Sequence, residues 1–343
     1  MPISAPFLPA SSIRRIAVIH GFEPGMGLRS RPSSVFFRRR VGGHHRSRSP
    51  RRNSVTQPPD GRAVITAAMW MGGALASFSG MAVAARELSA DMSTFEILFF
   101  RSLVGLLVLL PIFLRNRGAG LRSHRPGLQL VRNAIHFSAQ YGWVAAIAVL
   151  PLAEAFALEF TMPIWATLLA VIALGERMTV PRFIAVTGGF VGVLVILRPG
   201  FAAFNPAVLY MLAAALGYAG SVVITKLLVR KDSPLTIIFY MSAMQLPFAL
   251  VPALFDWTQP TLTHLPWLIV IGVGGLSAHF TLARALNLAD ATIVLPIDFL
   301  RLPLAAFIGA AFYSEQLVIW VIIGAAIIFG ANYYMVWQES RRR

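Results

Sequence analysis

The 343-residue chain contains no cysteine and few charged residues. Without cysteine, a disulfide framework and a thiolate metal site are both excluded. Charged residues make up 13% of the chain and hydrophobic residues 57%. In soluble domains about a quarter of the residues are charged. The composition therefore excludes an ordinary soluble domain and indicates an all-α polytopic membrane protein.

The sequence also lacks the motifs of two other function classes. No GxxxxGK[ST] motif is present, which argues against ATP-driven transport by this chain alone. No HExxH-like metal pair or nucleophile–base set is present, which argues against an intramembrane enzyme. We therefore expect no catalytic residue, no metal site and no cofactor.

Most of the net charge of +16 lies in residues 1–61. This segment has 11 Arg, no Lys and two acidic residues, Glu23 and Asp60, which together give +9. The stretch FFRRRVGGHHRSRSPRRNS suggests nucleic-acid binding, but its Arg, Ser, Pro and Gly without apolar periodicity are typical of disorder. We interpret 1–61 as a disordered basic tail and expect no nucleic-acid partner. One alternative is that this segment is a targeting leader. Another is that the start of the protein is wrongly assigned and lies at Met69 or Met71.

Ten apolar runs of about 19–24 residues follow, each long enough to cross a ~30 Å hydrocarbon core as a helix. Several connections are only two to four residues long, so neighbouring helices must be antiparallel. The predicted spans are 63–85, 94–114, 128–149, 152–174, 180–198, 206–229, 234–255, 265–287, 290–313 and 317–337.

Basic residues in the loops predict the orientation of these spans. The loop RNRGAGLRSHR after the second span contains four Arg, whereas DWTQPTLTHLP after the seventh contains no Lys or Arg. The even-numbered spans are therefore expected to end in the cytoplasm. We predict a multi-pass inner-membrane protein with both termini cytoplasmic.

The ten spans form two similar halves, 62–200 and 201–338, followed by a basic C-terminal tail, 339–343. LPLAEAFALEFTMPIWATLLAVIALGE in the fourth span parallels LADATIVLPIDFLRLPLAAFIGAAFYSE in the ninth. Glu159 falls opposite Asp298, and each half closes this span with a Glu. Because five spans per half is an odd number, the second half is inverted in the membrane, as in many secondary transporters.

The sequence resembles the EamA-type branch of the drug/metabolite transporter superfamily. The resemblance rests on these paired segments, on FFRSL in the second span and on the Gly-rich TGGFVGVLVILRPG in the fifth. The likeness covers residues 62–338. It implies a 5+5 inverted-repeat carrier of small organic solutes, with spans one to four and six to nine around the cavity. Spans five and ten would support the fold or form a dimer. One departure is Ser314, which stands where the family pattern has Gly.

Asp298 and Arg301 lie three residues apart in the ninth span and therefore share one helix face. Ionised groups in hydrocarbon are costly and usually functional. One interpretation is an internal ion pair that only neutralises itself, and another is a substrate site or gate facing a cavity. Pro296 and Pro303 flank the pair and are expected to kink the helix.

Glu159 is the inverted counterpart of Asp298 and lies about 12 Å into its helix. Both acids are therefore expected near the membrane midplane, where a carboxylate with a raised pKa can carry a proton. Pro163 predicts a further kink four residues later.

Three more residues are candidates for the substrate or proton pathway. Arg101 lies deep in the second span, and His279 and Trp143 occupy equivalent places in the two halves. A snorkelling Arg and a satisfied interior His are the structural alternatives. Gly188 and Gly192 form a small-residue face suited to helix packing or dimerisation.

Taken together, these features predict a secondary active transporter of a small organic metabolite. We expect it to work by alternating access, coupled to protons or by exchange. A passive channel or facilitator is the alternative, and an intramembrane enzyme is a weaker one. The expected partners are the small-molecule substrate, the lipid bilayer and, as an alternative to a monomer, a second copy of the chain.

Overall fold

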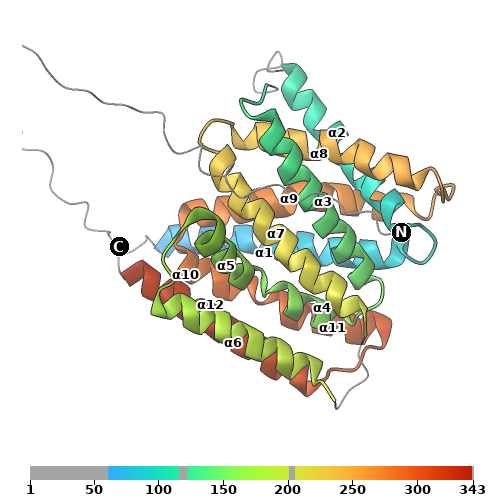
Figure 1. Ribbon diagram of the computed structural model, residues 1–343. Coiled ribbons are helices and arrows are strands. Elements are labelled where there is room, and N and C mark those ends of the chain that lie inside the picture. The colour runs from blue at the N-terminus through green and yellow to red at the C-terminus, as the bar shows by residue number, and fades with distance from the viewer. Residues whose placement is uncertain (1–60, 116–121, 201–204, 342–343) are drawn as a thin grey trace, which may run out of the picture. The chain divides into compact units, whose positions relative to one another are not determined.

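A computed structural model describes residues 61–115, 122–200 and 205–341. Residues 1–60 of the predicted basic tail lie outside this range. The twelve helices of the described chain (Figure 1) are α1 (Gly61–Leu88), α2 (Thr94–Arg115), α3 (Pro126–Ile147), α4 (Leu152–Glu159), α5 (Met162–Leu174), α6 (Val180–Leu197), α7 (Ala207–Leu228), α8 (Pro234–Ala253), α9 (Leu265–Leu288), α10 (Ala291–Asp298), α11 (Arg301–Tyr313) and α12 (Ile319–Arg341).

Two predicted spans are each divided into a pair of helices. The fourth consists of α4 and α5, and the ninth of α10 and α11. With each pair counted as one span, the described chain has the ten predicted spans, and nine of them are long and apolar enough to cross a membrane. The exception is α3, whose 22 residues suffice in length but include a series of polar side chains.

Proline explains where both spans are interrupted. Pro163 and Pro303 have no backbone N–H to donate to the carbonyl four residues earlier, which belongs to Glu159 and to Phe299. The helices stop at these points: α4 ends at Glu159, and α10 ends one residue before Phe299. Pro296, in contrast, lies inside α10 without interrupting it. The two halves of the chain therefore carry the same break at matching places.

Helix contacts follow the inverted repeat. The first span, α1, packs on α9, and α7, its counterpart in the second half, packs on α3. Counterpart spans also pack on each other: α2 on α8, α6 on α12, and α4 of the fourth span on α11 of the ninth. Figure 1 shows α6 alongside α12 and α3 alongside α7. The all-helical fold with two five-span halves is thus confirmed.

Gly188 and Gly192 face α12 of the same chain. A Cβ on Gly188 would lie 2.7 Å from the Cβ of Ala331, and one on Gly192 would lie 2.7 Å from the carbonyl oxygen of Gly324. Their missing side chains let α6 and α12 approach closely. Because this face is already covered, a homodimer stays a prediction that these glycines do not support.

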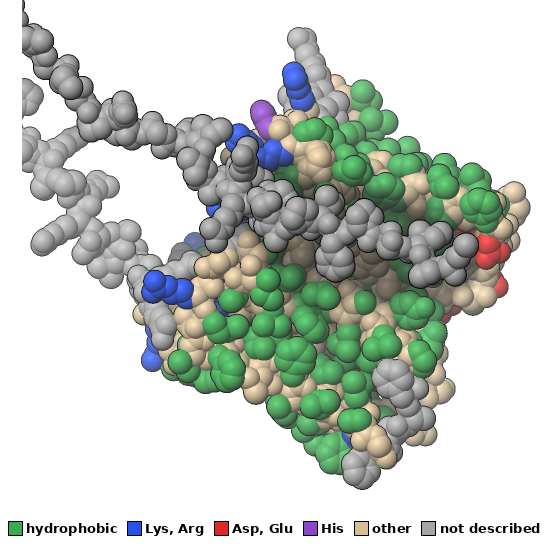
Figure 2. Space-filling model, viewed as in Figure 1, with side chains coloured by type: hydrophobic (Ala, Val, Ile, Leu, Met, Phe, Trp, Pro, Cys, Tyr) green, Lys and Arg blue, Asp and Glu red, His purple; other side chains and the backbone are tan. Residues whose placement is uncertain are grey.

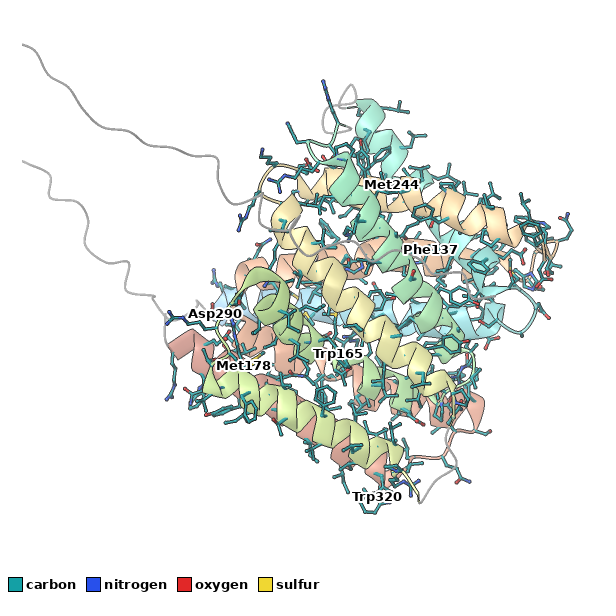
Figure 3. All side chains as sticks on the ribbon, in the orientation of Figure 1. Phe137, Trp165, Met178, Met244, Asp290 and Trp320 are labelled. Atoms are coloured by element: carbon teal, nitrogen blue, oxygen red, sulfur yellow. The ribbon has the colours of Figure 1, made fainter. Side chains whose placement is uncertain are left out.

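The surface has the pattern expected of a membrane protein. Hydrophobic side chains cover much of the described face in Figure 2, while Lys and Arg gather along one edge and Asp and Glu at the opposite edge. Trp320, labelled in Figure 3, contacts the Arg198 guanidinium at 6.0 Å from its ring centroid. Asp290, also labelled there, is exposed immediately before α10.

Candidate functional site

The two helix interruptions bring together two acids and one arginine. Glu159 is the last residue of α4, Asp298 the last of α10, and Arg301 the first of α11. The Arg301 guanidinium donates to Asp298 Oδ2 at 2.9 Å and to Glu159 Oε1 at 3.3 Å. Arg301 is only 6% exposed. The predicted pair of Asp298 and Arg301 is therefore a cluster of three charges that joins both halves.

Aromatic rings surround this charged cluster. The Arg301 guanidinium carbon lies 4.4 Å from the ring centroid of Phe78 and 4.9 Å from that of Phe160. Such rings stabilise a cation through the negative charge of their faces. On the other side, the Trp143 indole N–H donates to Glu159 Oε2 at 2.8 Å. Each charge of the cluster is thus positioned by an aromatic or ionic neighbour.

The cluster is not fully satisfied within the described chain. Arg301 Nε and Asp298 Oδ1 are buried and have no hydrogen-bond partner among the described residues. With both acids ionised, Glu159, Asp298 and Arg301 carry a net charge of −1. A cluster of this kind is able to accept one proton or a cationic group from a ligand.

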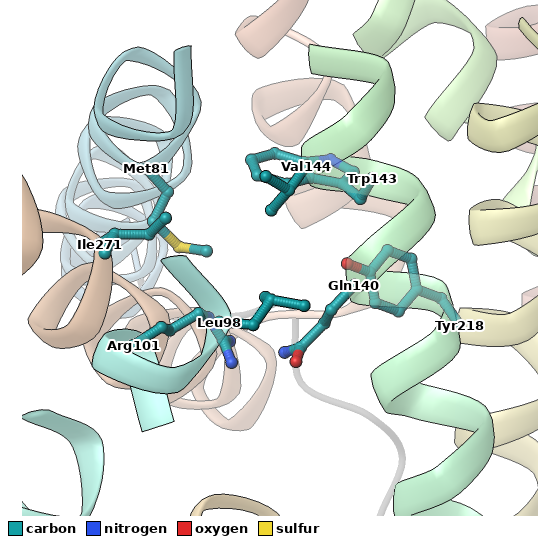
Figure 4. A pocket seen from close by; sticks show the side chains of 8 residues that line it. All are labelled: Met81, Leu98, Arg101, Gln140, Trp143, Val144, Tyr218 and Ile271. Carbon is teal, nitrogen blue, oxygen red and sulfur yellow. The ribbon is translucent and has the colours of Figure 1, made fainter. Parts of the chain in front are cut away.

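Arg101 lies beside a small cavity next to the cluster. The cavity measures about 20 Å³, enough for one water molecule. Figure 4 shows its lining side chains, which come from five helices and are Met81, Leu98, Arg101, Gln140, Trp143, Val144, Tyr218 and Ile271. Trp143 belongs both to this lining and to the charged cluster, so the two sites adjoin.

His279, the remaining pathway candidate, lies on α9 and is exposed. Its ring packs edge to face on Phe78, with the ring centroids 6.1 Å apart. Because Phe78 also contacts Arg301, His279 reaches the cluster through one aromatic ring. The structure thus gathers Glu159, Asp298, Arg301, Trp143, Arg101 and His279 around one region.

A stripe of buried polar side chains runs along α3 and was not among the predicted site residues. Its buried polar side chains recur every three or four residues and so share one helix face. They are Gln129, Arg132, Asn133, His136 and Gln140. Gln245 of α8 contacts His136 at 3.0 Å, and Asn133 contacts Met244 (Figure 3) at 3.4 Å. This spacing was the available signal, because polar groups on a membrane helix are expected to face the protein interior.

One end of the bundle is closed by what we call the Asp232 network, formed by Asp232, Ser123, His124 and Gln129. Asp232, in the α7–α8 connection, accepts from the backbone N–H of His124 at 2.8 Å, from Gln129 Nε2 at 3.0 Å and from the Ser123 hydroxyl. Burial alone would raise the pKa of Asp232, but these hydrogen bonds outweigh it and lower the pKa to about 2. The carboxylate therefore stays ionised at neutral pH and ties the two halves together.

The opposite end is closed by the Glu315 network, formed by Glu315, Arg86, Ile147, Leu150 and Leu152. Arg86, near the end of α1, pairs with Glu315 and donates to the carbonyl oxygens of Ile147 and Leu150. Glu315 also accepts from the backbone N–H of Leu152 at 2.8 Å. Along α3 the two networks are about 27 Å apart at 1.5 Å per residue. Hydrogen bonds thus join the two halves at both ends of the central region.

Residues that would hold a metal ion do not gather in the described chain. No group of three or more His, Asp or Glu side chains in these ranges is arranged to bind one. The site is instead built from buried charges, aromatic rings and interrupted helices.

Comparison with known proteins assigns the family. Residues 65–198 and 205–337 both match the EamA-like transporter family. The S-adenosylmethionine uptake transporter of Rickettsia bellii is 29% identical over 272 residues, covering 79% of this chain and 94% of that protein. The riboflavin transporter of Vibrio cholerae is 32% identical over 251 residues, covering 70% and 82%.

A solved crystal structure shows the same fold. It matches with a TM-score of 0.57 at 17% identity, covering 81% of this chain and 99% of that one. The family match covers both halves of the chain. Together with the relatives, it confirms the prediction that the protein is a membrane transporter and not an enzyme. This multi-pass membrane protein belongs to the EamA-like transporter family.

Proposed function

We propose that the chain is a secondary active transporter that moves a small organic metabolite across the inner membrane by alternating access. The observation that carries this proposal is Arg301, held between Glu159 from one half and Asp298 from the other. Secondary transporters build their sites where spans are interrupted near the midplane. An ion pair that bridges the halves can break and reform as they rock against each other.

The small size of the central cavity supports a carrier over a passive channel. A cavity of about 20 Å³ is far below the roughly 300–1,000 Å³ of small-molecule sites. A metabolite therefore enters only after one end opens. The Asp232 and Glu315 networks are the contacts that must open in turn, and each joins the two halves.

We propose a substrate class from the names of the relatives. Two of them are named for S-adenosylmethionine and for riboflavin. We infer that this chain carries a small organic metabolite of similar size. The acids Glu159 and Asp298 provide groups for proton coupling, and exchange of one metabolite for another is the second mode.

Transport by the purified protein in proteoliposomes tests the mechanism. With S-adenosylmethionine and riboflavin among the solutes, we expect saturable uptake of at least one. Uptake should be accelerated when the same solute is loaded inside, because a carrier reorients faster with substrate bound. Flux that rises linearly with concentration and shows no such acceleration would establish a channel instead.

The proposed orientation is tested by single cysteines on this cysteine-free chain. We expect a membrane-impermeant thiol reagent to label a Cys at Thr258 or Thr263 in intact cells. A Cys at Ala119 or at the exposed Arg122 should be labelled only after the membrane is opened. The reverse pattern would show that the termini lie outside the cytoplasm.

A further inference from the structure

Arg101 is a buried cation with no counter-ion among the described residues. Its exposed fraction is 7%, and within the described ranges it takes part in no ion pair or hydrogen bond. Arg is almost never fully buried unless it is paired, because an isolated charge in the protein interior loses its hydration without compensation. The partner of this guanidinium is therefore expected to come from outside the described chain.

Arg101 lies between the backbone of α9 and the small cavity. Behind it lies the backbone of α9 at Gly275, where a Cβ would be 2.9 Å from Arg101 Nη2. In front lies the cavity, across which the Gln140 amide points toward the guanidinium (Figure 4). Gln140 Oε1 has no hydrogen-bond partner among the described residues, and Tyr218 adds a hydroxyl to the same lining.

We propose that Arg101, with Gln140 and Tyr218, binds a carboxylate of the transported metabolite, a proposal that rests on the transport function above. The planar guanidinium matches a carboxylate through two parallel hydrogen bonds. The amide N–H groups of Gln140 and the Tyr218 hydroxyl are further donors. Because Arg101 is the single charged residue in this lining, it balances the one charge of a carboxylate better than a doubly charged phosphate ester.

The rest of the bound molecule lies toward the charged cluster. Trp143 lines the Arg101 cavity and donates to Glu159, so the indole stands between the two sites. The net charge of −1 at Glu159, Asp298 and Arg301 favours a neutral or cationic group there. Of the two solutes carried by the relatives, S-adenosylmethionine has a carboxylate and cationic groups, whereas riboflavin has no carboxylate.

Binding to the purified full chain tests this subsite without requiring transport. The probes are S-adenosylmethionine, its decarboxylated form and riboflavin. Because charge-assisted hydrogen bonds contribute about 1.5–3 kcal/mol, we expect decarboxylation to weaken binding about 10- to 100-fold. Arg101→Gln should bind S-adenosylmethionine and its decarboxylated form with the same low affinity. Arg101→Lys should retain part of the preference for S-adenosylmethionine. Gly275→Ala, which keeps every charge but displaces the guanidinium, should weaken only the carboxylate probe.

The melting temperature without ligand separates binding from a structural role. Arg101→Gln should melt at or above the wild-type temperature, because it removes an unpaired buried charge. The control Arg230→Gln, an exposed arginine of the α7–α8 connection, should change neither binding nor melting. The proposal is overturned if Arg101→Gln melts at a lower temperature than the wild type, or if this variant still binds S-adenosylmethionine more tightly than its decarboxylated form. It is also overturned if the wild type binds these two probes equally tightly. If the wild type binds S-adenosylmethionine more tightly than its decarboxylated form but shows no saturable uptake accelerated by preloading, the transport mechanism is refuted. The carboxylate subsite then remains supported.

Discussion

Replacing Arg301 by glutamine is expected to destabilise the protein by about 3–5 kcal/mol, the cost of leaving buried charges without their partner. Glu159 and Asp298 would then face each other with no cation between them. The rings of Phe78 and Phe160, which favour a cation, offer no hydrogen bond to the two acids. The thermal unfolding of detergent-solubilised protein and the amount in the membrane measure this effect.

Second changes in the same cluster make this prediction specific. Asp298→Asn alone should cost less, because Arg301 keeps Glu159 as its partner. The double variant Arg301→Gln with Asp298→Asn should recover most of the stability, since only Glu159 remains charged and Trp143 still donates to it. It should not recover transport. The control Arg230→Gln, at an exposed arginine of the α7–α8 connection, should stay within about 0.5 kcal/mol of wild type, as surface changes do.

Two results would contradict this view of the cluster. Wild-type stability of Arg301→Gln would mean that the acids are already protonated or solvated. A double variant that is less stable than both single variants would mean that the pair contributes packing rather than charge balance.

Much of the site was predictable because the inverted repeat constrains it. The likeness of the two halves placed Glu159 opposite Asp298, and the structure joins both to Arg301. The prolines indicated where the spans bend, because a missing N–H breaks the helix at a definite carbonyl. These inferences depend on local chemistry and on symmetry, both of which are visible in a sequence.

The remainder depends on contacts between helices that no spacing reveals. Phe78 resembles any other apolar residue of α1, and only the packing of α1 on α9 places it between Arg301 and His279. Asp232 lies in a short loop, where the sequence predicts a solvated charge. In the structure it accepts hydrogen bonds from Ser123, His124 and Gln129 instead. The length of the interruptions was also missed, since a proline alone predicts a kink rather than two separate helices.

Glu159 is the acid best placed to carry a proton. One oxygen accepts from Trp143 at 2.8 Å and the other from Arg301 at 3.3 Å, so the carboxylate is held from two sides. Protonation would remove its attraction to Arg301 and leave Arg301 to Asp298 alone. It would also change the cluster's net charge from −1 to zero, which alters the balance between the two halves.

Glu159→Gln is therefore expected to abolish uptake driven by a pH gradient while leaving exchange of substrate across the membrane. Glutamine resembles the protonated acid in shape and charge, so the protein can still reorient but cannot take up or release the proton. Proteoliposomes with an imposed pH gradient, compared with preloaded ones lacking a gradient, measure the two activities separately. The control Glu154→Gln, an acid of the same helix with no ion pair among the described residues, should keep both. If Glu159→Gln still accumulates substrate against the gradient, the proton is carried elsewhere and Asp298 becomes the next acid to test.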